Sequence, residues 1–188
     1  MGNHWSLHDE AERRKWQNPE EILTKSGVKP GYTFMDIGCG NGFFTLPAAR
    51  IVGTNGRVFA LDINPEYIDQ IKKKAASEHL MNLELKTGAA ENTVLCEGCV
   101  DIVFLGIVLH DFTDPFKVLL NVKRMLKPGG RLVNLDWKKE PMDIGPSLRK
   151  RFSTQKAEAI IKRAGLNIKS QSDVGAYYYM ITAINGEA

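Results

Sequence analysis

The sequence predicts an α/β fold with one doubly wound, mostly parallel sheet, and two observations carry that prediction. Short runs of apolar and β-branched residues alternate with longer segments of helical character, as expected for strands that helices cover on both faces. After the last helical segment, two strand-like runs follow each other directly, which indicates an antiparallel hairpin. The 188 residues suffice for one such domain, 1–188, and leave little room for a second.

Five strands are expected in the alternating part of the chain, because these runs are short and almost continuously apolar. They lie at residues 32–37, 57–61, 83–87, 101–106 and 131–136. The hairpin then joins runs at 166–172 and 177–183 through a turn at Asp173–Gly175. Its second strand is expected to be antiparallel and to lie at the edge of the sheet.

The helices between these strands have recognisable starts and ends. Asn64 and Asp114 each precede a proline, and a capping side chain followed by proline is a strong start signal. A helix expected at about 154–164 ends before Gly165, the residue type that most often terminates helices. A further helix is expected at 43–52, directly after a glycine-rich loop.

Two segments lie outside this alternation. Residues 1–27 precede the first strand and are expected to form a helical arm. Residues 137–153 contain two prolines, a glycine and a basic run, and we interpret them as an irregular loop beside the sheet.

Composition narrows the class of protein. Lysine and arginine number 25 against 22 acidic residues, a mild excess that is not typical of a histone-like nucleic-acid binder. No signal peptide or membrane-spanning run is visible, so a cytoplasmic location is expected. Three cysteines argue against a disulfide scaffold. Cys96-x-x-Cys99 has no second pair at ligand spacing, so we expect an incidental turn and no metal site.

The most informative motif is the loop Asp36-Ile37-Gly38-Cys39-Gly40-Asn41-Gly42, which follows the first predicted strand. Its glycines permit a tight turn and let a ligand approach bare backbone. A dinucleotide fingerprint requires a glycine at the next position, which is Phe43. Asp36 would repel a pyrophosphate but suits an ammonium group. The loop therefore favours S-adenosylmethionine, which carries an α-ammonium group and a sulfonium cation.

A second carboxylate is expected beside this loop. Asp62 ends the second predicted strand, and the C-termini of strands line the ligand crevice of an open α/β sheet. Its carboxylate can accept hydrogen bonds from both hydroxyls of a ribose, and Ile63 is placed to pack on an adenine face. The alternative, that Asp62 only starts the turn before Asn64, carries less weight because of its spacing from the glycine loop.

Five segments in this order resemble the class I S-adenosylmethionine-dependent methyltransferases, above all the type-11/type-25 group that includes ubiquinone/menaquinone-biosynthesis-like enzymes. The segments are DIGCGNG, ALDI, GAAENTVLCEGCVDIVF, VLHDFTDP and LKPGGRL. The resemblance covers about residues 15–185. It implies a Rossmann-like seven-stranded sheet with an antiparallel last strand, and S-adenosylmethionine as a methyl donor that leaves as S-adenosylhomocysteine.

The resemblance also implies roles for the matching residues. Asp36 would orient the loop and the amino group of the methionine part, and Asp62 would hold the ribose. The backbone of Gly38, Cys39 and Gly40 would cradle the methionine part. As in similar enzymes, the N-terminal arm at 1–27 would fold over the cofactor as a lid.

One position departs from the family pattern. Where relatives commonly have an aspartate that accepts a hydrogen bond from the adenine amino group, this chain has Ala89. Losing that bond would weaken cofactor binding by ~1.5–3 kcal/mol unless another group compensates. The backbone N–H of Ala90 remains as a donor to an adenine nitrogen.

Three residues at or just after the end of the fourth strand complete the predicted site. Gly106 and Ile107 are expected to line the methionine pocket through their backbone. His110 lies at the mouth of the crevice and is a candidate general base near neutral pH. The alternative is that His110 only packs near the cofactor.

The expected reaction is methyl transfer to a small-molecule acceptor by in-line displacement, in which positioning does most of the catalysis. One alternative is an RNA methyltransferase that uses residues 137–170, a segment with nine basic and three acidic residues. A second alternative is a non-catalytic protein that binds the cofactor or serves as a scaffold. A homodimer is compatible with the sequence.

Overall fold

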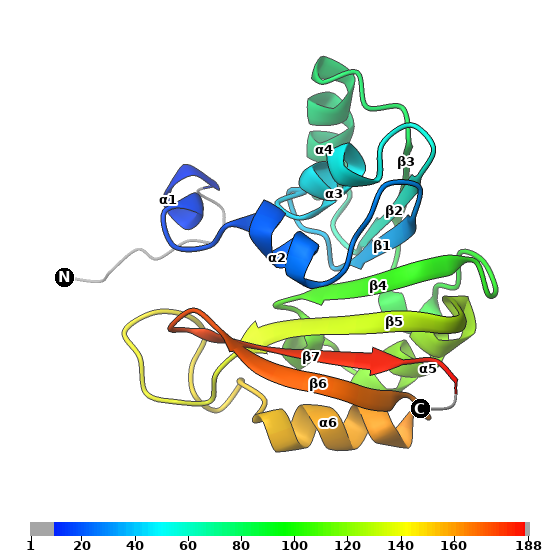
Figure 1. Cartoon of the computed structure of the whole chain (residues 1–188). Helices are drawn as coiled ribbons and strands as arrows, with labels where there is room; N and C mark the ends of the chain where they lie inside the picture. The colour runs from blue at the N-terminus through cyan, green and yellow to red at the C-terminus, as the bar shows by residue number, and fades with distance from the viewer. Residues whose placement is uncertain (1–9, 187–188) are drawn as a thin grey trace.

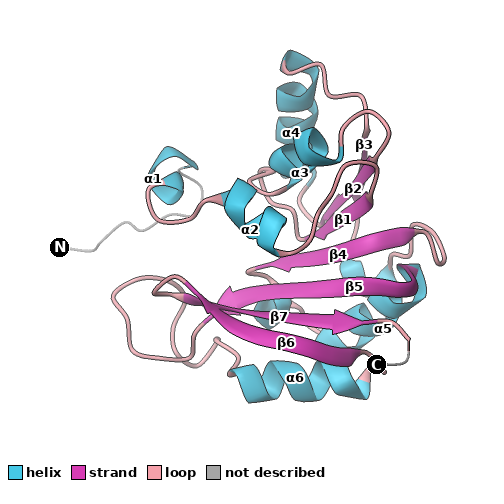
Figure 2. Ribbon diagram, viewed as in Figure 1, coloured by secondary structure: helices cyan, strands magenta, loops and turns pink. Residues whose placement is uncertain are grey.

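The structure is a computed structural model, of which residues 10–186 are described below. Residues 1–9 of the predicted arm lie outside the described residues. A single twisted sheet runs through the molecule, and helices cover it on both faces (Figure 1; Figure 2).

The sheet has seven strands in the order β3-β2-β1-β4-β5-β7-β6. The strands are β1 (Thr33–Ile37), β2 (Arg57–Asp62), β3 (Leu83–Thr87), β4 (Val100–Gly106), β5 (Leu126–Trp137), β6 (Asn167–Val174) and β7 (Tyr178–Ile184). The first five pair in parallel, whereas β7 is antiparallel to both β5 and β6. The predicted seven-stranded, mostly parallel sheet with an antiparallel last strand is confirmed.

The hairpin differs from the prediction in one respect. The antiparallel strand β7 lies between β5 and β6, so the edge of the sheet is β6. Burial explains this order, because β7 is apolar and almost wholly buried, whereas β6 is polar and mostly exposed. A polar edge strand also protects the sheet from pairing with other chains. The turn between the two strands lies at 175–177 rather than at 173–175.

β5 also begins earlier than predicted, at Leu126 rather than at 131. Leu126 pairs with Val100 of β4, and an irregularity in the register follows before Arg131 pairs with Ile102. The glycine-rich turn after α5 is therefore drawn into the sheet.

The helices are α1 (Glu10–Arg14), α2 (Pro19–Lys25), α3 (Thr45–Val52), α4 (Pro65–Ser77), α5 (Pro115–Met125) and α6 (Thr154–Arg163). The predicted caps are present: Asn64 accepts a hydrogen bond from the N–H of Glu66, and Asp114 accepts one from the N–H of Lys117. Helix α3 starts at Thr45, two residues later than predicted, because the glycine loop continues to Phe44.

Two apolar layers sandwich the sheet. Helices α2, α3 and α4 cover one face and contact residues such as Phe34 and Ala60, while α5 and α6 cover the other and contact residues such as Met35 and Leu105. The central strands are buried on both faces, as the apolar runs in the sequence require. This packing fixes the C-terminal ends of β1, β2 and β4 at one edge of the sheet.

The sequence predicted only an incidental turn at the CxxC pair before β4. Cys96 and Cys99 form a disulfide in the structure, since the turn brings the two side chains together. Among residues 10–186, no cluster of three or more His, Cys, Asp or Glu side chains has the arrangement of a metal site. No helix in the same range has the length and apolar character of a membrane span.

Candidate cofactor site

A cavity of about 710 Å³ opens at the C-terminal ends of β1, β2 and β4. Its size is typical of small-molecule sites. All ten residues predicted to bind a cofactor line it: Asp36, Gly38, Cys39, Gly40, Asp62, Ile63, Ala89, Ala90, Gly106 and Ile107. The sheet topology brings them together, since parallel strands end at the same edge.

The glycine loop follows a path that side chains would obstruct. Gly38, Gly40 and Gly42 all have positive φ angles, of 72°, 52° and 90°. A Cβ atom on Gly38 would lie 2.5 Å from Cγ2 of Val108. The N–H groups of Gly38 and Cys39 donate to the carbonyl oxygen of Leu61, at 2.8 and 3.2 Å, which attaches the loop to the end of β2.

Asp62 is fixed by the same loop. Its Oδ2 accepts a hydrogen bond from the N–H of Gly40 at 2.8 Å, and its Oδ1 accepts one from the N–H of Asn64 at 2.9 Å. Each carboxylate oxygen has a further lone pair, so the group can still accept hydrogen bonds from two hydroxyls of a ligand. Ile63 next to it is 72% exposed, as a residue that packs on a ligand face would be.

Asp36 is a buried carboxyl at the base of the cavity, 1% exposed. Burial raises its pKa to about 7, and the charge of Asp62 adds to this effect. The hydroxyl of Thr45, which donates to Oδ2 at 2.7 Å, and the charge of Arg13 act in the opposite direction. A cationic ligand beside Asp36 would supply the positive charge that favours its ionised form.

Cys39 is free but buried, and burial raises the pKa of its thiol. It is therefore not an activated nucleophile. Its position in the loop suits a backbone contact rather than covalent chemistry.

The third wall of the cavity is the turn η1 (Ala90–Asn92), which follows β3. Asn121 of α5 donates to the carbonyl oxygens of Ala90 and Glu91, both at 3.0 Å. Oε1 of Glu91 accepts hydrogen bonds from the N–H groups of Thr113 and Asp114, at 3.1 and 3.4 Å. Helix α5 and the loop before it therefore hold this wall, and Ala89 itself offers a ligand no side-chain acceptor.

The end of β4 carries local strain. Ile107 has a φ angle of 66°, which is rare for a β-branched residue, and its N–H donates to the carbonyl oxygen of Leu135 at 2.7 Å. A Cβ on Gly106 would lie 2.8 Å from Cε1 of Phe104 and 2.9 Å from Cδ2 of Phe44. Only glycine lets the end of β4 approach Phe44, which follows the glycine loop, so closely.

His110, predicted as a catalytic base, belongs to the turn η2 (Leu109–Asp111) and is not among the cavity-lining residues. Its Nδ1 lies 2.7 Å from Oδ1 of Asp136, and its Nε2 lies 3.5 Å from Oδ2 of Asp111. Burial opposes the charged imidazolium, but the two carboxylates outweigh it and raise the pKa of His110. Asp111, by contrast, does line the cavity.

Sequence reasoning missed several lining residues, among them Arg13, Phe43, Phe44, Tyr67 and Asp111. Arg13 belongs to α1, far from any motif in the sequence. No pattern could have found it, because only the folding of the arm brings α1 to the glycine loop. Asp111 adjoins the predicted His110, and its polar side chain at the crevice mouth was the available signal.

The comparisons with known proteins agree with this geometry. A family model described as a methyltransferase domain matches residues 28–180. A solved structure of an S-adenosylmethionine-dependent methyltransferase from Aquifex aeolicus is 31% identical, with a TM-score of 0.87 and 92% of each chain covered. The chain therefore belongs to the class I S-adenosylmethionine-dependent methyltransferases.

The curated relatives narrow the group. The ubiquinone/menaquinone biosynthesis C-methyltransferase UbiE of Marinomonas sp. (strain MWYL1) is 27% identical over 172 residues, 91% of this chain and 65% of that protein. The demethylmenaquinone methyltransferase of Geobacillus sp. (strain WCH70) is 30% identical over 122 residues, 65% of this chain and 51% of that protein. This chain thus spans less than two thirds of the length of these relatives. Its domain is of the UbiE-like, type 11 group.

Proposed function

We propose that this protein transfers a methyl group from S-adenosylmethionine to a small organic acceptor, and that it does so mainly by positioning. The observation that carries the proposal is the cavity itself, in which bare glycine backbone lies between two carboxylates, Asp36 and Asp62. The cofactor, when bound, supplies a methyl group already activated by a sulfonium leaving group. What the protein must add is alignment, which is worth ~7–11 kcal/mol in favourable cases.

Different residues of the cavity would contact different parts of the cofactor. Asp36 and the backbone of the glycine loop would hold the ammonium end, and Asp62 the ribose hydroxyls. Ile63 and the backbone N–H of Ala90 would hold the adenine ring. Gly106 and Ile107, which line the cavity, would border the methionine part.

We assign Val108, Asp111 and Phe112, which line the cavity, to the part that would receive the acceptor. This mixture of apolar side chains with one carboxylate suits a small organic molecule. If the acceptor must lose a proton, Asp111 is the group that can contact it. His110 lies between two carboxylates, with Nε2 3.5 Å from Asp111 and Nδ1 2.7 Å from Asp136. His110 would therefore act on the reaction only through Asp111, as a positioning residue.

An RNA acceptor receives less support, because most of the basic residues between 137 and 170 already have partners. Six of the nine contact an acidic side chain, a carbonyl group or an aromatic ring: Lys138, Lys150, Arg151, Lys156, Lys162 and Arg163. Arg151 is buried and donates to the carbonyl oxygens of Glu140, Ile144 and Pro146, so it organises the loop that the sequence predicted as irregular.

Titration calorimetry with S-adenosylmethionine and S-adenosylhomocysteine tests the proposal, followed by turnover against a panel of phenolic, quinol and carboxylate acceptors. Binding of both nucleosides and methylation of one acceptor is the expected result. Binding of NAD or FAD in their place would overturn it. Binding without any turnover would favour the non-catalytic alternative, and RNA binding that weakens steeply with salt would favour an RNA substrate.

A further inference from the structure

The N-terminal helix α1 carries a buried arginine into the cofactor cavity. Arg13 is 6% exposed and lines the cavity together with Asp36. Its guanidinium carbon lies 3.7 Å from the centre of the Phe43 ring, at the end of the glycine loop. The arginine therefore stands beside the loop, although twenty or more residues separate it from every predicted site residue.

The donors of Arg13 are not met by the protein. Within residues 10–186, the one hydrogen bond of its side chain runs from Nε to Oε1 of Gln17 at 2.6 Å, and no carboxylate of that range lies within ion-pairing distance. A guanidinium has five N–H donors, so the four on the two terminal nitrogens remain available to a ligand in the cavity. Burial lowers the pKa of Arg13 to about 10, so it still carries its charge at neutral pH.

Two further polar groups near Arg13 are also unsatisfied. The buried side-chain atoms Nε2 of Gln17 and Oη of Tyr178 have no hydrogen-bond partner among the described residues. Gln17 holds the Nε of Arg13, and the charge of Arg13 acts on Tyr178. Of these three residues only Arg13 lines the cavity, so its terminal nitrogens are the donors that a bound anion can meet there.

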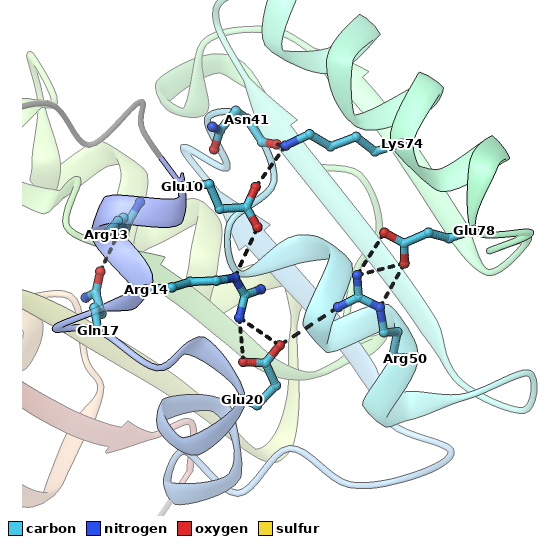
Figure 3. A network of polar contacts seen from close by, with 9 residues as sticks. All are labelled: Glu10, Arg13, Arg14, Gln17, Glu20, Asn41, Arg50, Lys74 and Glu78. Carbon is cyan, nitrogen blue, oxygen red and sulfur yellow. Dashed lines mark hydrogen bonds and ion pairs between the residues drawn. The ribbon is translucent and has the colours of Figure 1, made fainter.

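A network of ion pairs fixes α1 in this place (Figure 3). Lys74 of α4 donates to Glu10 at 3.1 Å and to the carbonyl oxygen of Asn41, in the glycine loop, at 3.2 Å. Arg14 donates to Glu20 at 3.0 Å, and Glu20 in turn faces Arg50 of α3. Single exposed pairs contribute little, but this set joins α1 to the loop itself. The position of Arg13 is therefore coupled to the loop that holds the ligand.

We infer that Arg13 binds the carboxylate of the methionine part of S-adenosylmethionine, so that α1 forms one wall of the cofactor site. The inference rests on the proposed function. The two charged groups at this end of the cavity, the Asp36 carboxyl and the Arg13 guanidinium, match the ammonium and carboxylate of one α-amino acid. A carboxylate on the acceptor is the other possible source of the anion, and the choice of ligands below separates the two.

Two ligands that differ only in this carboxylate test the inference. S-adenosylmethionine and decarboxylated S-adenosylmethionine are titrated calorimetrically into the full-length wild-type protein and into Arg13→Met. We expect the wild type to prefer the carboxylate-bearing ligand by about 10- to 100-fold, since hydrogen bonds to charged groups are of that strength. In Arg13→Met the preference should fall to within about threefold of unity, while the affinity for the decarboxylated ligand changes little.

Controls distinguish recognition from a structural effect. Arg124→Met removes an exposed arginine of α5 and should keep the wild-type preference. Arg13→Lys, which keeps the charge but not the planar fork, should show an intermediate preference. Equal weakening of both ligands in Arg13→Met would overturn the inference, as would a wild-type protein without any preference. A wild-type protein that binds neither ligand would instead overturn the proposed function, and this inference with it.

Discussion

Replacing Asp36 by asparagine should stabilise the cofactor-free protein, and more so at high pH than at low pH. The Asp36 carboxyl is buried, and burial raises its pKa from the usual 3.8 to about 7. A raised pKa in the folded state means that the folded chain holds the proton more tightly than the unfolded chain does. Stability is therefore lost as the pH rises from about 4 to about 7, and the loss is complete above that range.

The magnitude follows from the same shift. At 1.36 kcal/mol per pH unit, the raised pKa lowers the free energy of unfolding by about 4 kcal/mol at pH 8 and by about 2 kcal/mol at pH 5, where the carboxyl is ionised in the unfolded chain but still protonated in the folded one. Asparagine removes this cost and can still accept the hydrogen bond from the Thr45 hydroxyl. The gain of Asp36→Asn over the wild type should thus grow by about 2 kcal/mol between pH 5 and pH 8.

Urea unfolding of both proteins without cofactor, at pH 5 and pH 8, measures this difference. Asp69→Asn changes an exposed carboxyl of α4 and should alter stability by no more than about 0.5 kcal/mol at either pH. A gain for Asp36→Asn that is the same at both pH values would refute the argument, because it would mean that the buried carboxyl does not titrate in this range. The same substitution should weaken cofactor binding, since asparagine cannot pair with the ammonium group.

Three further outcomes are expected. Asp62→Ala should weaken S-adenosylmethionine binding at least about tenfold with the fold intact, because hydrogen bonds between a charged carboxylate and ligand hydroxyls are lost; an unchanged dissociation constant in calorimetry would remove Asp62 from the site. His110→Ala should leave cofactor affinity within about threefold, as His110 does not line the cavity, and should lower turnover only for acceptors that must lose a proton; a total loss of binding would contradict its place behind Asp111. Gly106→Ala should destabilise the protein by about 1–3 kcal/mol in thermal unfolding, because its Cβ would crowd Phe44, and unaltered stability would show that the loop yields at this point.

The sequence by itself determined the sheet and the ten predicted residues of the cofactor cavity. Strand periodicity predicts the alternation of strands and helices, since a strand buried on both faces must be apolar throughout. The loop around Gly38 follows the end of β1, and Asp62 is the last residue of β2. Parallel strands in one sheet have their C-terminal ends at the same edge, so these residues must lie close together. These are local features whose placement the fold class dictates.

Tertiary structure alone decided the order of the hairpin strands, the surroundings of His110 and the arrival of Arg13. β7 lies between β5 and β6 because its apolar side chains gain more from burial than the polar side chains of β6 would. The pairing of His110 with Asp136 joins two segments that are 26 residues apart, and no local pattern encodes it. Helix α1, which carries Arg13, is joined to α4 by the Glu10–Lys74 ion pair and to α3 only through Glu20 of α2. Such contacts between distant segments depend on how whole elements pack and not on the residues beside them.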